Sequence, residues 1–468
     1  MNRTVHFVSL GCPKNLVDSE VMLGLLQNDG FTVVERPEDA RVIVVNTCSF
    51  IEPAKEESVN AILEMASYKE RDKGQCDKLV VAGCLSQRYS KELASGLPEV
   101  DHFIGTGEYG KISEIIDSSE RIAVGIPRYL ADHLAPRVVT SGPFAYLRIS
   151  EGCSNPCTFC IIPKLRGRHR SRTIASLVAE AEQMAGQGVV ELNLIAQDLT
   201  DYGSDLKDGS DLVRLLDALE KIEGIRWIRM LYAYPRELPD AFFAKLAGGG
   251  KILPYLDIPV QHASDPMLRR MKRHHDRAFT VDLLRALRER VPGITLRTSL
   301  IVGFPGETDE EYAELRAFVK EIRFERMGCF PYSHEEGTVA YELPETLDQK
   351  VIDQRRRGLM TLQKRISRAA NKKLIGQVVE ALVEGPSEET ELLLQARMST
   401  QGPGGIDGYA YINDGFARPG TIVKLEITEA HDYDVVGHIV GVVAEPPVLA
   451  PRPSAPRQGR SAALPVLG

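Results

Sequence analysis

Six strand-like apolar runs alternate with amphipathic helical patterns through the middle of this 468-residue chain, and this alternation limits its possible folds most. The expected strands lie at residues 144–149, 189–195, 227–234, 255–260, 295–302 and 327–331. Expected helices include residues 176–187, 211–222, 279–290 and 309–322, the last beginning with the capping-box pair Thr308 and Glu311. Alternating strands and helices indicate a parallel sheet with right-handed crossovers. Six units rather than eight predict a partial (β/α)6, TIM-like barrel over residues 144–368, open on one side.

Three cysteines follow the first of these strands. Cys153, Cys157 and Cys160 have the spacing Cys-x3-Cys-x2-Cys. Thiolates hold iron–sulfur clusters, and a four-iron cluster normally takes four of them, so either a distant cysteine completes the set or one iron is left open. An open iron could chelate S-adenosylmethionine (SAM) and release a carbon radical from it. The alternative is structural zinc, which prefers paired two-residue spacings and four closed ligands.

Polar side chains collect at the expected C-terminal ends of the barrel strands, where barrel active sites form. They are Gln197, Asp198, Tyr232, Tyr234, Gln261, His262 and Ser299. Any one of them could instead cap a helix or satisfy a loop, but as a set they are the predicted binding site for the cofactor. Arg297 lies two residues before Ser299 and shares its face of the sheet. An inward arginine needs an anionic partner, and we expect a cofactor carboxylate to be that partner.

Three apolar runs in the first 126 residues each end in a cysteine. Residues 5–12, 41–48 and 78–84 end in Cys12, Cys48 and Cys84, with helical patterns at residues 19–27 and 54–65 between them. Strand ends in a parallel sheet share one edge, so these cysteines should converge although 36 residues separate each from the next. They would suit a second iron–sulfur cluster with an open iron. The alternative is that each is a small buried hydrophobic residue, as we expect for Cys76 and Cys329.

In the final hundred residues a basic helix and short strand-like runs replace the alternation of strands and helices. Residues 348–374 are helical and basic, with Arg355, Arg356 and Arg357 in the middle. Period-2 runs follow at residues 376–384, 391–396, 409–413, 421–430 and 434–443. Turn residues separate them, which predicts a small five-stranded antiparallel barrel over residues 369–443. Residues 127–143 are predicted to be a linker, and residues 444–468, rich in Pro, Ala and Arg, are predicted to be disordered.

Charge and composition argue against two classes of protein, general nucleic-acid binders and membrane-spanning proteins. The net charge of −8 argues against a general nucleic-acid binder. Between residues 371 and 443 there are eleven acidic and five basic residues, so this barrel suits a cationic protein better than a phosphate backbone. The basic run at residues 166–172 either contacts cofactor or substrate or forms a solvated face. No run approaches the roughly 20 apolar residues of a membrane span. We expect a cytoplasmic protein whose eight cysteines are too few for a disulfide scaffold, so that the cysteines other than Cys76 and Cys329 are metal or redox ligands.

Taken together, the chain resembles the radical SAM methylthiotransferases. Its three parts match that family in order: a cysteine-bearing α/β domain (residues 1–126), a radical SAM barrel with the Cys-x3-Cys-x2-Cys signature, and a TRAM module. Residues 11–20 (Gly-Cys-Pro-Lys-Asn-Leu-Val-Asp-Ser-Glu), 155–163 and 432–437 are similar to one branch of the family. That branch adds a methylthio group to the β-carbon of an aspartate in ribosomal protein S-twelve.

The resemblance implies two [4Fe-4S] clusters and SAM. The barrel cysteines would hold the cluster that cleaves SAM, and the resulting deoxyadenosyl radical would remove hydrogen from an unactivated carbon. The N-terminal cysteines would hold a second cluster whose open iron presents sulfur, which a separate SAM would methylate. Gln197, Asp198, Gln261, Arg297 and Ser299 are the predicted SAM contacts. No motif identifies the electron donor or the sulfur source.

Two alternatives stand beside this hypothesis. The closer one is the branch that methylthiolates an adenosine in tRNA, which a basic TRAM surface would have favoured. The other is a non-enzymatic iron–sulfur electron carrier or RNA-binding scaffold. Neither an electron carrier nor a scaffold gives a reason for two tricysteine sites with open irons.

Overall fold

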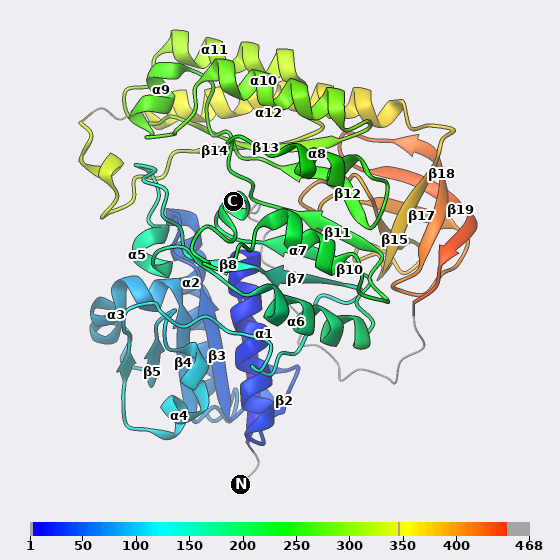
Figure 1. Ribbon diagram of the computed structural model, residues 1–468. Helices are drawn as coiled ribbons and strands as arrows, with labels where there is room; N and C mark the ends of the chain where they lie inside the picture. The colour runs from blue at the N-terminus through cyan, green and yellow to red at the C-terminus, as the bar shows by residue number, and fades with distance from the viewer. Residues whose placement is uncertain (1–2, 345–346, 447–468) are drawn as a thin grey trace.

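The computed structural model describes residues 3–344 and 347–446, which form three units in chain order. Figure 1 shows an N-terminal α/β unit in blue, a central green half-barrel, and a C-terminal β-barrel in orange. This is the α/β multidomain architecture expected from the sequence. No helix within these described ranges is long and apolar enough to cross a bilayer.

The N-terminal unit is a six-stranded, wholly parallel sheet in the order β2-β1-β3-β4-β5-β6. Its strands are β1 (Thr4–Ser9), β2 (Thr32–Val33), β3 (Val42–Thr47), β4 (Lys78–Gly83), β5 (His102–Ile104) and β6 (Ile122–Ala123). Its α-helices are α1 (Pro13–Asn28), α2 (Glu52–Ala66), α3 (Cys84–Gly96) and α4 (Ile112–Asp117). Helix α1 begins six residues before the predicted start at residue 19, because Pro13 at its first position has φ preset for a helix.

The half-barrel is a second parallel sheet in the order β7-β10-β11-β12-β13-β14. The strands are β7 (Phe144–Arg148), β10 (Glu191–Ile195), β11 (Trp227–Met230), β12 (Ile252–Asp257), β13 (Thr295–Val302) and β14 (Arg326–Pro331). Six strands in an open sheet confirm the predicted partial barrel. Strand β11 ends at Met230 rather than residue 234, and Tyr232 just beyond it has a left-handed φ of 67°.

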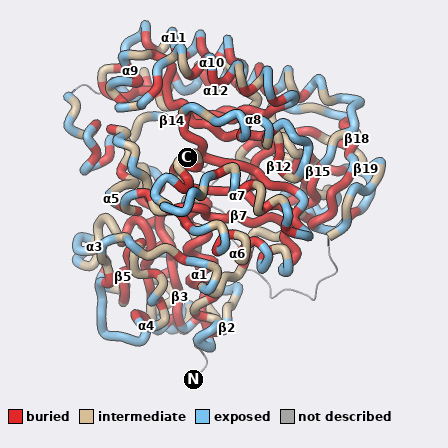
Figure 2. The backbone as a smooth tube through the Cα atoms, viewed as in Figure 1, coloured by how far each residue is buried: buried red, intermediate tan, exposed pale blue. Residues whose placement is uncertain are grey.

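Helices cover the half-barrel on its outer face. They are α6 (Ile174–Gly186), α7 (Leu212–Leu219), α8 (Asp240–Ala247), α10 (Arg277–Arg290) and α11 (Asp309–Ile322). The short helix α9 (Asp265–Arg270) packs instead beside the cysteine loop, where the Thr158 N–H donates to the Met271 carbonyl at 3.1 Å. The short helix α5 (Ile162–Arg166) and the antiparallel pair β8 (Ser150–Glu151) and β9 (Arg170–Ser171) flank the cysteine loop. The predicted capping box of Thr308 and Glu311 is present at the start of α11. Apolar side chains from the strands and these helices form the largest core, seen as buried central strands in Figure 2.

Helix α12 (Gln349–Lys372) leads to the C-terminal barrel. The strands β15 (Val378–Pro386), β16 (Leu394–Met398), β17 (Ala410–Asp414), β18 (Ile422–Ala430) and β19 (Val435–Ala444) close it in the order β15-β16-β17-β19-β18. The prediction of a fully antiparallel barrel is wrong in one place, because β17 and β19 pair in parallel. Residues 447–468, most of the tail predicted to be disordered, lie outside the described residues.

Buried ion pairs join the three units. Residues 127–143 contain no helix or strand, yet Arg137 in this segment pairs with Glu20 of α1 at 2.6 Å and with Glu180 of α6 at 2.7 Å. At the other end of the half-barrel, Glu191 pairs with Arg229 at 2.9 Å and also with Arg397 of the C-terminal barrel. The side chains of all these residues are at most 9% exposed. Because an unpaired buried charge would be costly, these ion pairs favour the observed placement of the units.

Candidate active site

One cavity between the N-terminal unit and the half-barrel is lined by all six of the singled-out cysteines. Cys12, Cys48 and Cys84 come from one side, and Cys153, Cys157 and Cys160 from the other. The polar and charged side chains that also line it are Lys14, Glu57, Asn155, Arg166, Gln197, Tyr232, Tyr234, Gln261 and Arg273. Its apolar lining is Phe50, Ile51, Ala54, Phe159, Ile162, Leu165, Ala233 and Pro259. The two predicted tricysteine sites therefore face a single space.

The N-terminal cysteines converge because each follows the end of a neighbouring strand, β1, β3 or β4. Gly11 and Gly83 precede Cys12 and Cys84 and have φ of 85° and 98°, a region that favours glycine. A Cβ on Gly11 would lie 2.7 Å from Cys48 Cβ, which shows how closely the β1 and β3 ends approach. The backbone turns that direct these thiols to one edge thus depend on glycine.

Each N-terminal thiol has a different environment. The Cys48 backbone N–H donates to Ser58 Oγ at 3.0 Å, which fixes the turn after β3. Burial, together with the nearby Cys84 and Cys12 thiolates, raises the pKa of Cys48. Burial also raises the pKa of Cys84, while the Arg166 guanidinium opposes this. Such thiols ionise when a cation neutralises them, and iron would do so.

The barrel cysteines lie on one loop after β8. The Asn155 N–H donates to Cys153 Sγ at 3.5 Å, and Arg273 Nη1 donates to Cys157 Sγ at 3.5 Å. Burial raises the pKa of Cys153 to about 11, and burial and the Cys157 thiolate raise that of Cys160. Donors directed at sulfur and three convergent thiols are the features that a cluster site needs.

No three Cys, His, Asp or Glu side chains within residues 3–344 and 347–446 lie close enough to share one metal ion. A four-iron cluster distributes its thiolates over separate irons. Its cysteines therefore need not approach as closely as the ligands of a single zinc ion do. The donor set at both trios, thiols with polar donors directed at them, fits iron–sulfur clusters.

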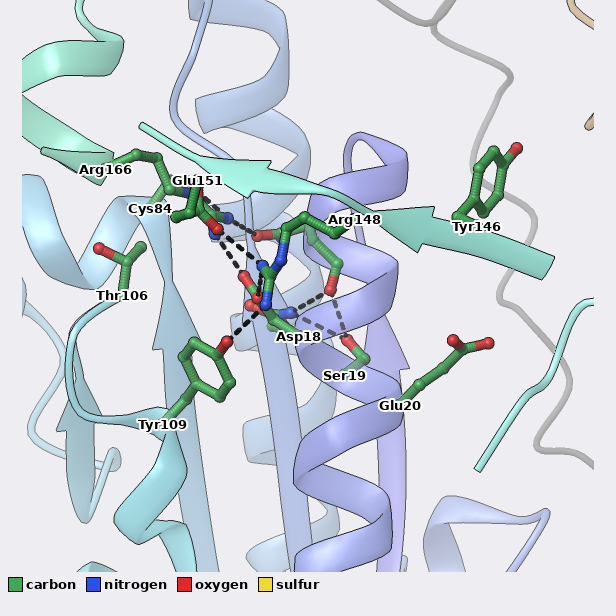
Figure 3. A network of polar contacts seen from close by, with 12 residues as sticks. Asp18, Ser19, Glu20, Cys84, Thr106, Tyr109, Tyr146, Arg148, Glu151 and Arg166 are labelled. Carbon is green, nitrogen blue, oxygen red and sulfur yellow. Dashed lines mark hydrogen bonds and ion pairs between the residues drawn. The ribbon is translucent and has the colours of Figure 1, made fainter. Parts of the chain in front are cut away.

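A buried charge network lies beside the N-terminal trio and joins α1 to the half-barrel (Figure 3). Asp18 of α1 pairs with Arg148 at 2.5 Å and with Arg166 at 2.6 Å, and Glu151 pairs with Arg148 at 2.7 Å. Arg166 Nη2 also lies 3.5 Å from Cys84 Sγ. The solvated-face alternative is wrong for Arg166, which is buried, whereas contact with cofactor or substrate stays a prediction because Arg166 lines the cavity. This run supplies an interface between units.

Of the five predicted SAM contacts, two line the cavity and three do not. Gln197 and Gln261 line the cavity, and Gln197 donates to Glu151 at 2.5 Å. Asp198 lies just outside, where it accepts from Asn155 at 2.8 Å and pairs with Arg236 at 2.5 Å. Ser299 does not line the cavity, although its backbone carbonyl accepts from the Gln261 N–H at 3.0 Å.

Arg297 faces the barrel interior but has protein partners. It pairs with Asp257 at 2.8 Å and with Asp407 of the C-terminal barrel at 3.3 Å, and it does not line the cavity. These carboxylates supply the anionic partner that we had expected from the cofactor. Burial of Arg297 therefore needs no cofactor carboxylate. Asp407 could not have been matched to it from sequence, because it belongs to another unit.

Two residues that sequence reasoning did not select bring charge into the cavity. Lys14, in the first turn of α1, is 6% exposed, and burial lowers its pKa to about 8. Arg273 stacks over Tyr234, 4.0 Å from the ring centroid. Tyr232 and Gln261 have left-handed φ of 67° and 68°, an unfavourable conformation for non-glycine residues that is concentrated at functional sites. The signal for Lys14 was its place two residues after Cys12.

Family models match each unit. The Uncharacterized protein family UPF0004 matches residues 4–105, the Radical SAM superfamily matches residues 147–319, and the TRAM domain matches residues 375–440. A solved structure of the radical S-adenosylmethionine methyltransferase TsrM from Kitasatospora setae, with cobalamin and a [4Fe-4S] cluster bound, is similar in fold. Its TM-score is 0.52 at 15% identity, covering 71% of this chain and 72% of that one.

Curated relatives match over nearly the whole length. A protein of Myxococcus xanthus named ribosomal protein uS12 methylthiotransferase RimO is 53% identical over 99% of this chain and 96% of its own. A protein of the same name from Anaeromyxobacter sp. (strain K) is 54% identical over 98% of this chain and 97% of its own. Another, from Geobacter sulfurreducens, is 48% identical over 93% of this chain and 98% of its own.

Proposed function

This chain belongs to the RimO family of radical SAM methylthiotransferases, and from this premise we propose that it adds a methylthio group to the β-carbon of an aspartate in ribosomal protein uS12. The observation that carries the proposal is the single cavity lined by two tricysteine sites. Substrate carbon and sulfur can meet only where both sites open on a common space. One cavity provides that space.

The radical SAM superfamily uses a [4Fe-4S] cluster and SAM. In this chain Cys153, Cys157 and Cys160 would hold that cluster, because their spacing matches the superfamily signature and their thiols converge. When bound, the cluster and SAM supply a carbon radical able to take hydrogen from an unactivated carbon. Asn155 and Arg273 donate N–H groups to the sulfurs of Cys153 and Cys157 and so help to orient these two thiols.

We assign a second [4Fe-4S] cluster to Cys12, Cys48 and Cys84. When bound there, it would present the sulfur that is transferred. Arg166 donates to Cys84 Sγ and is itself fixed by Asp18 at 2.6 Å and by the Asn15 side chain at 2.8 Å. Its guanidinium therefore holds one sulfur of this site in a fixed position.

The cavity wall supports radical chemistry by its composition. Gln197, Tyr234 and Gln261 offer polar groups to SAM from the strand ends of the half-barrel. The apolar part of the lining would disfavour water beside the two clusters when they are bound. We keep Asp198 and Ser299 as outer contacts, which orient Asn155 and Gln261. Arg297 has no direct role in this assignment.

The C-terminal barrel suits a basic protein partner. Its Arg397 is fully buried against Glu191 and its Asp407 is buried against Arg297, so one base and one acid of those counted from sequence are absent from the surface and the acidic excess remains. Glu380, Glu388, Glu389 and Glu391 are exposed. An acidic surface disfavours tRNA and favours a ribosomal protein, and a ribosomal protein substrate places the enzyme in the cytoplasm.

The reconstituted protein, supplied with SAM, a sulfide source and a reductant, tests the proposal on purified uS12 and on total tRNA. Mass spectrometry should detect methylthio-aspartate in uS12 and no methylthio-adenosine in tRNA. Modified adenosine with unmodified uS12 would assign the chain to the other branch. Absence of SAM cleavage would exclude a radical SAM enzyme altogether.

A further inference from the structure

Lys14 is a buried cation without a carboxylate partner, and it opens on the cavity. Within the described residues, its one direct contact of a polar or charged kind is with the face of the Tyr232 ring, 3.0 Å from Lys14 Nζ to the centroid. A buried ammonium group normally has an acidic partner. Lys14 therefore lacks a partner that its position calls for.

The nearby carboxylates are committed to other groups. Asp257 pairs with Arg297 at 2.8 Å and accepts from the Tyr232 N–H at 3.1 Å. Glu151 accepts from Arg148 at 2.7 Å and from Gln197 at 2.5 Å. Neither lies within ion-pair distance of Lys14. The anion of this chain that attracts Lys14 most is the Cys12 thiolate, which the proposed function assigns to the cluster, so a carboxylate partner for Lys14 would come from outside this chain.

Tyr232 adds a second unsatisfied donor at the same place. Its side chain is 4% exposed, and its hydroxyl is buried without a hydrogen-bond partner among the described residues. The Lys14 amine lies over the ring, and the hydroxyl lies at its edge. An ammonium and a hydroxyl so placed can donate to the two oxygens of one carboxylate.

We propose that Lys14 and Tyr232 bind the side-chain carboxylate of the target aspartate. This inference rests on the proposed function, since it takes uS12 as the substrate. In aspartate the carboxyl carbon is bonded directly to the β-carbon. Lys14 and Cys12 line the same cavity and attract each other electrostatically. A carboxylate bound to Lys14 would therefore bring the β-carbon, one bond away, close to the trio assigned to the transferred sulfur. An adenine ring offers no anion for this pair of donors.

Binding measurements with the reconstituted full-length enzyme and SAM test the inference independently of turnover. The probes are purified uS12 and uS12 with its target aspartate changed to asparagine, which keeps the shape and removes the charge. We expect the wild-type enzyme to bind the aspartate form about 10–100-fold more tightly, the worth of a charge-assisted hydrogen bond. In Lys14→Met the two forms should bind alike, whereas Lys14→Arg should retain much of the preference.

Two further variants make the test specific. Tyr232→Phe should reduce the preference by a smaller factor, about 3–10-fold, because one neutral donor is lost. Lys111→Met is the matched control, since Lys111 is exposed and its amine pairs with Glu108. It should leave the preference unchanged.

The outcomes separate failure of the inference from failure of the proposed function. Wild-type enzyme that binds both forms equally, or Lys14→Met that keeps the wild-type preference, overturns the inference. So does a Lys14→Met variant that loses affinity for SAM while still preferring aspartate, because Lys14 would then bind the cofactor. If Lys14→Met fails to bind its clusters, the aspartate preference of Tyr232→Phe and Lys14→Arg still tests the inference. Failure of the wild-type enzyme to methylthiolate uS12 defeats the proposed function instead.

Discussion

The two tricysteine sites are built in opposite ways around the same cavity. Cys153, Cys157 and Cys160 belong to one loop of eight residues, from Cys153 to Cys160. Cys12, Cys48 and Cys84 come from the ends of three neighbouring strands and meet only when the N-terminal sheet has formed. The first site is local and the second depends on tertiary structure.

This difference has consequences for folding and for chemistry. A loop can present its three thiols as soon as its own conformation is set. The dispersed site requires β1, β3 and β4 to pair in register, and it requires glycine at Gly11 and Gly83 for the turns. We therefore expect the dispersed site to be more sensitive to distant substitutions, and the loop site to be more sensitive to loss of a single thiol.

Loss of a loop thiol should have the largest effect. We expect Cys153→Ala to abolish 5′-deoxyadenosine formation and all methylthiolation, because the cluster that activates SAM cannot assemble. Iron content after reconstitution should fall from roughly eight to roughly four per chain. Chromatographic analysis of deoxyadenosine and iron assay check this. Deoxyadenosine formation at the wild-type rate would show that SAM is cleaved elsewhere.

Loss of a dispersed thiol should separate the two halves of the reaction. We expect Cys48→Ala to retain deoxyadenosine formation and to lose methylthiolation, since radical generation needs only the loop site. Parallel assays of deoxyadenosine and of methylthio-aspartate in uS12 measure this. Methylthiolation at the wild-type rate by Cys48→Ala would show that the N-terminal trio has no role in the reaction, and the two trios could then not be compared as halves of one mechanism.

The sequence predicted the local features well. Strand β13 and helix α11 have the predicted bounds, and the capping box at Thr308 fixes the latter. Both cysteine trios were also identified, one from spacing and the other from strand order. Hydrophobic periodicity and capping depend on residues close in sequence, which makes them readable without a structure.

Long-range partners could not be read in this way. Arg297 was expected to need an anion, but its second partner is Asp407, 110 residues later in another unit. Arg166 was assigned to cofactor or solvent, yet it pairs with Asp18, 148 residues earlier. The parallel pairing of β17 and β19 likewise depends on how the whole barrel closes, which no local pattern reveals. Lys14 belongs to the predicted motif at residues 11–20, but its burial against the Tyr232 ring joins residues 218 positions apart and cannot be read from the motif.

Each trio has one arginine at the same distance from a sulfur, which allows a matched comparison. Arg166 lies 3.5 Å from Cys84 Sγ, and Arg273 lies 3.5 Å from Cys157 Sγ. A nearby cation favours the reduced, more negative cluster. Removing it with Arg166→Gln should lower the potential of the N-terminal cluster by on the order of 50 mV, and Arg273→Gln should do the same for the loop cluster.

Redox titrations followed by electron paramagnetic resonance can assign each shift to one site. Arg166→Gln is measured with Cys153→Ala, and Arg273→Gln with Cys48→Ala, so that one cluster is present at a time. Each arginine variant placed in the opposite background serves as the control and should leave the potential within error. A shift of both clusters by either substitution would show that the buried network of Asp18, Arg148 and Glu151 couples them.

The smallest effect tests the dependence of the dispersed site on its turns. Gly11→Ala places a Cβ 2.7 Å from Cys48 Cβ on a residue with φ of 85°, which should cost about 1–3 kcal/mol of unfolding free energy. Because the clash pushes directly on Cys48, the N-terminal site should also load less iron while the loop site loads fully.

Gly96→Ala, in α3 with open space where its Cβ would lie, is the matched control and should be neutral or slightly stabilising. Denaturant unfolding of the cluster-free protein gives the stability, and iron assay gives the loading. Equal loss of iron from both sites would show that the loop site, too, depends on the packing of the N-terminal sheet.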